Sequence, residues 1–209
     1  MTYNPFSKKR TLTDNRSLAT KTELRKRLLA DMGITDAYVL DTCAGAGEIW
    51  AAMADHVNVK QWIRCDLKPR QHGTLALSAQ QAIQNLPLDT FNVIDIDPYG
   101  EPWEPYMALL ARLRKPTAVF VTRGHVGWSR LSHATVAFVG LPDEWFMDLP
   151  RTPQLCQHAA DLLLQRTWDF ADILHSYMVR MRRVDYFALG LAPVPKDQRG
   201  SKRFIALDH

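Results

Sequence analysis

The residue types best suited to chemistry on an aromatic amine stand in Asp97-Pro98-Tyr99-Gly100, the turn that ends a predicted buried strand beginning near Phe91. The Asp97 carboxylate and the Pro98 carbonyl provide two acceptors for the two hydrogens of an exocyclic amine, and the proline ring fixes the turn. Tyr99 offers a flat face on which an extruded base can stack. The alternative is an ordinary strand-ending turn with a partly buried tyrosine.

A second candidate site is the stretch Asp-Thr-Cys-Ala-Gly-Ala-Gly at residues 41–47, between a predicted strand at 37–41 and a predicted helix at 48–56. Gly45 and Gly47 have no side chains, so backbone N–H groups can approach a ligand there, and the helix N-terminus beyond favours negative charge. Taken alone, a small-residue turn of this kind is more often only a tight turn.

Asp66 follows the next predicted strand, at residues 61–65, and stands about 25 residues after Asp41. An acid in this place can accept two hydrogen bonds from ribose hydroxyls, as in dinucleotide sites. The dinucleotide GxGxxG spacing is not met, which disfavours NAD. Because open α/β sheets bind ligands at the carboxyl ends of their strands, we expect Asp41, Asp66 and Asp97 to lie at neighbouring strand ends.

The elements that must position these residues are predicted from the apolar pattern. Helices are expected at 22–32 with Gly33 at its C′ position, 48–56, 79–86, 105–114 and 154–175, and strands at 37–41, 61–65, from Phe91 onward, 118–122, 177–191 and 203–207, with a further short strand at 74–77. The expected fold class is α/β, a Rossmann-like, doubly wound, mostly parallel seven-stranded sheet with an antiparallel terminal strand. One crossover helix, between residues 66 and 91, is expected to be reduced or missing.

The length of 209 residues suits one substantial core. We expect an N-terminal arm at residues 1–16 and a single domain at 17–209, with a loop-rich insertion at about 123–153. The sequence has no signal-type segment and no apolar stretch of membrane-spanning length. Its three cysteines form no CxxC pair, which argues against a disulfide framework or a zinc site. A reduced, cytoplasmic protein without a membrane partner is expected.

The net charge is +4, and the basic residues gather in four clusters. These clusters are Lys8-Lys9-Arg10, Lys21 with Arg25-Lys26-Arg27, Arg180 with Arg182-Arg183, and residues 196–203. Clustered cations suit a polyanionic partner, because neutralising phosphates releases counterions. A solvated surface face is the equally weighted alternative.

The loop after Asp41 and the turn at Asp97 together resemble the class I S-adenosylmethionine-dependent methyltransferases, particularly those that methylate exocyclic amines of bases. The run at residues 95–102 is similar to the Asp-Pro-Phe-Gly-Ser-Pro segment of the catalytic domain of tRNA (guanine-N2-)-dimethyltransferases. Tyr3-Asn4-Pro5 and Asn15-Arg16-Ser17 resemble the N-terminal signature of that family, although an acid stands where this chain has Ser17.

The resemblance implies S-adenosylmethionine as cofactor and in-line methyl transfer to an amine held by Asp97, Pro98 and Tyr99, without a metal. It implies a cofactor site made of Arg16, Asp41, Cys43, Ala44, Gly45, Gly47, Asp66 and Ser78. Cys43 is interpreted there as a small apolar residue and not as a nucleophile. Phe6, Gly100, Arg123 and His125 are the candidates for contact with the base or its phosphates.

Three functions therefore remain open. The favoured one is methylation of guanine N2 in tRNA by this nucleic-acid-binding protein. The second is methylation of an adenine or cytosine amino group in DNA, and the third is a catalytically idle methyltransferase fold that binds RNA or another protein. No counterpart of the C-terminal RNA-binding domain of the family is expected in this sequence, and a partner subunit or homo-oligomer is left open.

Overall fold

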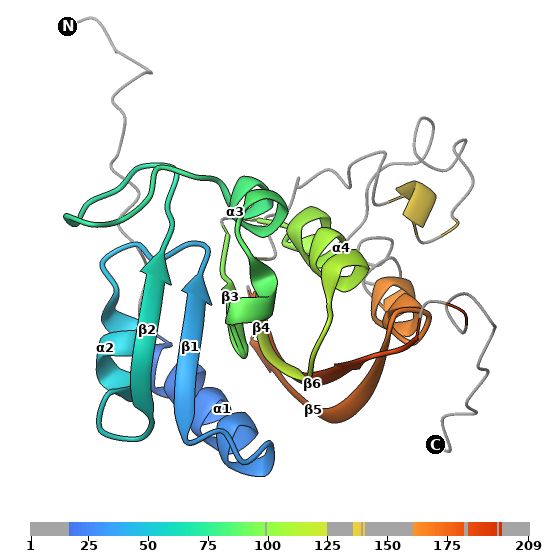
Figure 1. The fold of residues 1–209 in the computed structure, drawn as a ribbon, viewed down its shortest axis with the longest axis horizontal. Helices are drawn as coiled ribbons and strands as arrows, with labels where there is room; N and C mark the ends of the chain where they lie inside the picture. Colours follow the sequence, from blue (N-terminus) through green and yellow to red (C-terminus); the bar gives the residue numbers. More distant parts are fainter. Residues whose placement is uncertain are drawn as a thin grey trace, which may run out of the picture.

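The computed structural model describes residues 17–98, 100–124, 136–138, 140, 161–181, 184–195 and 197. The described chain forms one sheet of six strands in the order β2-β1-β3-β4-β6-β5 (Figure 1). The strands are β1 (Asp36–Asp41), β2 (Asn58–Arg64), β3 (Val93–Ile96), β4 (Thr117–Gly124), β5 (Ala171–Met181) and β6 (Val184–Pro193). The first four run parallel, and β6 runs antiparallel to both β4 and β5. The predicted mostly parallel sheet with an antiparallel end is confirmed.

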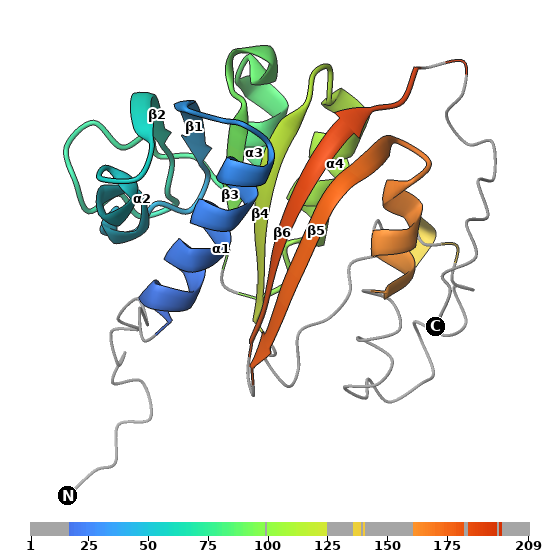
Figure 2. The same cartoon turned by 90° about the horizontal axis from the view of Figure 1, so that it is seen from below.

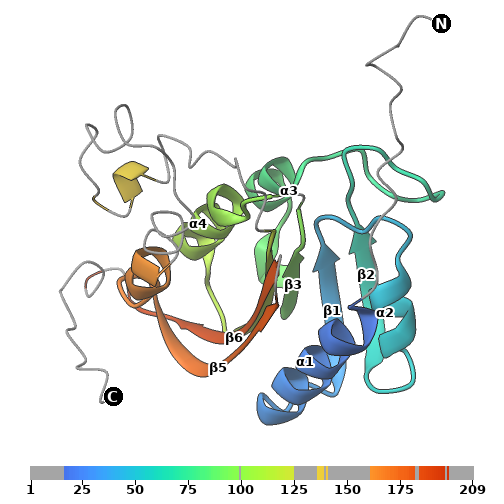
Figure 3. The same cartoon turned by 180° about the vertical axis from the view of Figure 1, so that it is seen from behind.

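The helices cover both faces of this sheet. They are α1 (Leu18–Asp31), α2 (Glu48–Met53), α3 (Ala79–Asn85) and α4 (Trp103–Arg112), with a 3₁₀ turn η1 (Leu88–Thr90) and a helical stretch at residues 161–167. Figures 2 and 3 show α1 and α2 on one side of the sheet and α3, α4 and residues 161–167 on the other. The sheet is therefore doubly wound, as predicted. None of the described helices is long and apolar enough to cross a membrane.

Neighbouring residues of the central strands enter opposite cores. Val93 of β3 packs with the core under α1 and α2, and Ile94 packs with the core under α4. The same alternation holds for Ala118 and Val119 of β4. Both members of each pair are buried, which explains why these strands appear as apolar runs without alternating polarity.

The edge of the sheet beside β2 differs from the prediction. The expected short strand at residues 74–77 is reduced to an isolated parallel bridge between Cys65 and Leu75. The described sheet therefore has six strands and not seven. The crossover between β2 and β3 contains only the seven-residue α3, which agrees with the expected reduction of this helix.

The terminal region also corrects two predictions. The helix expected at 154–175 is helical at 161–167 but gives way to β5 at Ala171, and the strand expected at 177–191 is broken into the β5–β6 hairpin. Leu174 and Met178 are exposed on β5 while alternate residues pack inward, so the spacing is that of a strand. The predicted arm at 1–16, most of the insertion at 123–153 and the strand at 203–207 lie outside the described residues.

Helix α1 is fixed at both its apolar face and its end. Leu24, Leu28 and Leu29 are buried against the sheet. Gly33 follows the helix with a φ of +64°, and the Ile34 N–H donates to the Leu29 carbonyl at 2.8 Å. This is a Schellman ending with glycine at C′, as predicted.

Candidate functional site

The tips of β1 and β3 lie side by side at the carboxyl edge of the sheet (Figure 1). Asp41 is the register partner of Asp95. The Thr42 N–H and hydroxyl both donate to the Asp95 carbonyl, at 3.0 and 2.8 Å. Burial raises the pKa of the Cys43 thiol, and the nearby Asp97 carboxylate raises it further. The predicted closeness of the two strand ends is therefore confirmed.

The loop that follows β1 requires glycine for conformation and for space. Gly45 and Gly47 have φ values of +53° and +75°. A Cβ atom on Gly47 would stand 2.9 Å from Cη2 of Trp62. The Gly45 N–H donates to Oδ2 of Asp66 at 2.9 Å, and the Gly47 N–H donates to the Ala44 carbonyl at 2.7 Å. These two N–H groups close the loop onto itself and onto the neighbouring strand end.

Asp66 joins the two neighbouring loops at this edge. Its Oδ2 atom accepts from Gly45, and its Oδ1 atom accepts from the Lys68 N–H at 2.8 Å. A carboxylate has about four acceptor positions, so each oxygen can still accept a hydroxyl. The half-buried position of Asp66 at the end of β2 fits the predicted ribose acceptor.

Asp41 is a buried carboxylate with few good partners. The Cys43 N–H and the Trp62 indole N–H both donate to it at 3.4 Å, which is long for a hydrogen bond. Burial raises the pKa of Asp41 well above its usual range, and the Asp95 carboxylate raises it further, while Arg25 lowers it. Within the described part of the chain no cation lies within ion-pair distance of Asp41. The residue thus has the acceptor capacity that a cationic ligand group needs.

Two residues that the sequence analysis did not assign to the site hold Asp95. Arg25 of α1 donates to Oδ2 from Nε at 3.0 Å and from Nη2 at 2.5 Å, and the Trp50 indole N–H donates to the same oxygen at 2.9 Å. The Oδ1 atom of Asp95 is buried and has no hydrogen-bond partner among the described residues. This orphaned acceptor faces the same side of the sheet as Asp41.

Asp97 is held by Lys21, which the sequence analysis also did not assign to the site. The Lys21 Nζ atom lies 2.5 Å from Oδ2 of Asp97, and the two side chains are 7% and 17% exposed. The basic cluster of α1 was considered a possible surface for a polyanion, but its members Lys21 and Arg25 point into the protein. The sequence could have predicted that these two side chains point inward, because Lys21 and Arg25 share the helical spacing of Leu24 and Leu28.

The turn after Asp97 is tied to the next strand. Gly100 has a φ of +101°, a conformation that side-chain-bearing residues rarely adopt. Its carbonyl accepts a hydrogen bond from the Gly124 N–H at 3.0 Å, at the end of β4. Pro98 is half-buried, and Tyr99 lies outside the described residues.

The structure gives two of the predicted site residues a different use. The Ser78 hydroxyl accepts from the Gln81 N–H at 3.1 Å in a capping box at the start of α3. Arg123 is 4% exposed and pairs with Glu101 at 3.3 Å and with Asp185 at 3.4 Å. Its guanidinium is thus committed inside the protein and does not present itself to phosphate.

The remaining predicted residues divide into two groups. Cys43 is half-buried and Ala44 is buried, both in the loop after β1, and burial raises the pKa of the Cys43 thiol, which fits its interpretation as a non-nucleophile. Phe6, Arg16 and His125 lie outside the described residues, as Tyr99 does.

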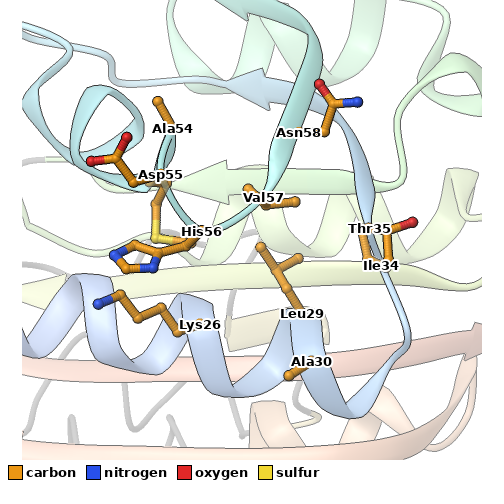
Figure 4. Close-up of a pocket in the computed structure, with 11 residues that line it drawn as sticks. Lys26, Leu29, Ala30, Ile34, Thr35, Ala54, Asp55, His56, Val57 and Asn58 are labelled. Atoms are coloured by element: carbon orange, nitrogen blue, oxygen red, sulfur yellow. The ribbon is translucent and has the colours of Figure 1, made fainter.

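A pocket of about 630 Å³ lies at the opposite edge of the sheet, between the ends of α1 and α2 and the starts of β1 and β2 (Figure 4). Lys26, Leu29, His56 and Asn58 are among the residues that line it. It contains none of the predicted site residues. The carboxyl ends of the strands, with their carboxylates, remain the candidate site.

No protein-family model matches the chain, and no curated protein matches its sequence. Among solved structures, the chain is similar to Trm1 from Pyrococcus horikoshii in complex with S-adenosyl-L-methionine, with 14% identity and a TM-score of 0.55 over 92% of this chain and 56% of that chain. The chain thus spans little more than half the length of Trm1.

Weaker likenesses extend to a protein from Haemophilus influenzae described as a methylase and to one from Streptococcus mutans described as a methyltransferase, in complex with SAH. The first has 12% identity and a TM-score of 0.46 over 82% of this chain and 99% of that chain. The second has 10% identity and a TM-score of 0.42 over 83% and 97%. The likeness to Trm1 shows that this chain has the Rossmann-like fold of the class I methyltransferases.

Proposed function

We propose that this protein is an S-adenosylmethionine-dependent methyltransferase that acts on an exocyclic amine of an RNA base, with guanine N2 in tRNA as the leading target. The observation that carries the proposal is the adjacency of the Asp41 loop and the Asp97 turn at the carboxyl edge of β1 and β3. The solved structure of Trm1, which shares this fold, contains S-adenosyl-L-methionine. The similarity of residues 95–102 to the tRNA guanine-N2 family supports the choice of base.

The residues at this edge fit the cofactor. When bound, it supplies a methyl group on a positively charged sulfur. Asp41 has a carboxylate with only two long hydrogen bonds, so it can accept the cationic amino-acid end. Asp66 can still accept ribose hydroxyls beside its two backbone donors.

Asp97 and Pro98 would hold the amine. An exocyclic amine is a weak nucleophile because its lone pair is delocalised into the ring, and acceptors for its hydrogens return density to nitrogen. Methylation would leave a cationic nitrogen that must lose one proton, and the Asp97 carboxylate would take that proton and pass it to water. Positioning of the two reactants supplies much of the remaining rate.

Nucleoside mass spectrometry of bulk tRNA, after incubation with the protein and labelled cofactor, tests this proposal. We expect a labelled N2-methylguanosine, and we expect Asp97→Ala to lower its formation at least about 100-fold while cofactor affinity changes less than about twofold. Asp89→Ala, an exposed carboxylate in η1, is the matched control and should retain wild-type activity. Full activity of the Asp97→Ala variant would contradict the assignment of Asp97.

Two further measurements test the other two candidate functions. Competition between tRNA and duplex DNA distinguishes an RNA enzyme from a DNA amino-methyltransferase. The internal use of the Gly45 and Gly47 N–H groups is the observation that favours a catalytically idle fold, because neither group is left for a ligand. Absence of cofactor binding in a calorimetric titration would support that third function.

A further inference from the structure

Two ion pairs, one above the other, join helix α1 to the end of strand β3. Lys21 and Arg25 are four residues apart on α1, so they share a helix face, and Asp95 and Asp97 are two apart at the end of β3, so they share a sheet face. Lys21 pairs with Asp97 and Arg25 pairs with Asp95, each at 2.5 Å. The spacing of one helical turn thus matches the spacing of alternate strand residues.

The Lys21–Asp97 ion pair is largely shielded from water. Lys21 is 7% exposed on its side chain, and its ammonium lies 5.4 Å from the centre of the Tyr186 ring on β6. Its backbone carbonyl accepts a hydrogen bond from Nη1 of Arg25 at 2.7 Å, which fixes the turn of helix between the two cations. A pair removed from bulk water is stronger and better oriented than a surface pair.

The pairing divides the two oxygens of Asp97. Oδ2 is taken by Lys21, while Oδ1 has no hydrogen-bond partner among the described residues. Asp97 is 17% exposed on its side chain, so one end of the carboxylate remains accessible. A carboxylate held by one oxygen cannot rotate freely, and its free oxygen is then fixed in direction.

We propose that Lys21 is a positioning residue for the methyl transfer: it holds Oδ2 of Asp97 and leaves Oδ1 as the acceptor for the amine hydrogen. This inference rests on the proposed function. Lys21 does not touch the base; it acts through Asp97. With Oδ2 occupied, Asp97 binds one amine hydrogen, and the second hydrogen of a primary amine is bound by the Pro98 carbonyl.

The experiment compares Lys21→Met and Lys21→Arg with Lys26→Met, which makes the same change on the same helix at a lysine that forms no ion pair with the described residues. We expect Lys21→Met to lower kcat about 10- to 100-fold, with cofactor Kd, measured by calorimetry, within about twofold of wild type. Lys21→Arg should restore most of the loss, because a guanidinium can also hold one carboxylate oxygen. Lys26→Met should leave kcat within about twofold.

A second comparison isolates the path through Asp97. In the Asp97→Ala background, adding Lys21→Met should change the residual single-turnover rate less than about twofold, because Lys21 no longer has a carboxylate to position. The double variant leaves neither member of the ion pair without its partner, and circular dichroism of each variant checks that the compared proteins are folded.

Three outcomes overturn the inference. They are an unchanged kcat in Lys21→Met, a parallel loss of cofactor binding in that variant, and a further large loss on adding Lys21→Met to Asp97→Ala. A wild-type protein that methylates no nucleic acid would overturn the proposed function along with it, and this result differs visibly from an active wild type with an insensitive Lys21.

Discussion

Two clusters of charged residues, each built around buried carboxylates, differ in how their charges are paired. The strand-tip cluster consists of Lys21, Arg25, Asp41, Asp95 and Asp97, and the hairpin cluster consists of Glu101, Arg123, Arg180 and Asp185. In the hairpin cluster each carboxylate is held by a guanidinium, since Arg123 contacts both Glu101 and Asp185, and Arg180 contacts Asp185 at 3.1 Å. In the strand-tip cluster three carboxylates meet two cations.

The difference separates a cluster that holds the fold from one that can also bind. Buried charges are ordinarily paired, because an unpaired one costs several kcal/mol of desolvation. Among the described residues Asp41 lacks a cation within ion-pair distance, and burial together with the neighbouring Asp95 carboxylate raises its pKa. An incompletely neutralised cluster at the carboxyl edge of a parallel sheet is a site that a cationic ligand would complete.

Removing Arg25, the more deeply buried cation of the strand-tip cluster, should have the largest effect on stability. Arg25→Met keeps packing against Phe120 but leaves Asp95 without its guanidinium, so we expect the free energy of unfolding to fall by about 3–5 kcal/mol. Urea denaturation measures this loss. Arg27→Met, on the same helix and stacked on Tyr177 at the surface, is the control and should cost less than about 1 kcal/mol. Equal losses for the two variants would mean that the cluster is not a buried one.

Disrupting the hairpin cluster should destabilise the protein without touching its chemistry. Asp185→Asn keeps hydrogen-bonding capacity but removes the charge that faces Arg123 and Arg180, and we expect a loss of about 2–3 kcal/mol. Methyl transfer per folded molecule should remain within about twofold. If Asp185→Asn lowered kcat without lowering stability, the hairpin cluster would also take part in the reaction, which would contradict the assignment.

Removing the Asp41 carboxylate should increase the free energy of unfolding, in contrast to the two changes above. The raised pKa of Asp41 means that the folded state favours its protonated form, so the stability contributed by protonation falls as pH rises from the unfolded value through the folded one. Asp41→Asn removes this dependence, and the variant should become more stable than wild type at neutral pH, on the order of 1 kcal/mol. Unfolding curves from pH 4 to 8 measure the difference, which should grow with pH. A difference that shrinks with rising pH would contradict the sign.

The positions of the strand ends could be predicted because an acidic residue stands at the end of each apolar run. Asp41, Asp66 and Asp97 each follow a predicted strand, and parallel strands place their carboxyl ends at one edge. Lys21 and Arg25 were not recognised, because clustered cations usually lie at the surface and only their shared face with Leu24 shows otherwise.

Other features of the structure depend on three-dimensional contacts that the spacing of residues in the sequence does not predict. The use of the Gly45 N–H depends on how the loop turns back to Asp66. The start of β5 was hidden because Phe170 and Leu174 fit a helical spacing as well as a strand. The strand expected at residues 74–77 is reduced to a bridge because it lies at an edge of the described sheet, where Cys65 and Leu75 alone pair and no second neighbour stabilises a longer ladder.

The most direct measurement is calorimetric titration of S-adenosylmethionine into wild type, Asp41→Asn and Asp185→Asn. The account predicts binding to wild type, binding at least about tenfold weaker to Asp41→Asn, and unchanged binding to Asp185→Asn, because Asp41 has no ion-pair partner among the described residues, whereas Asp185 is paired with Arg123 and Arg180. Equal affinity in wild type and Asp41→Asn, or no binding to wild type, would contradict it.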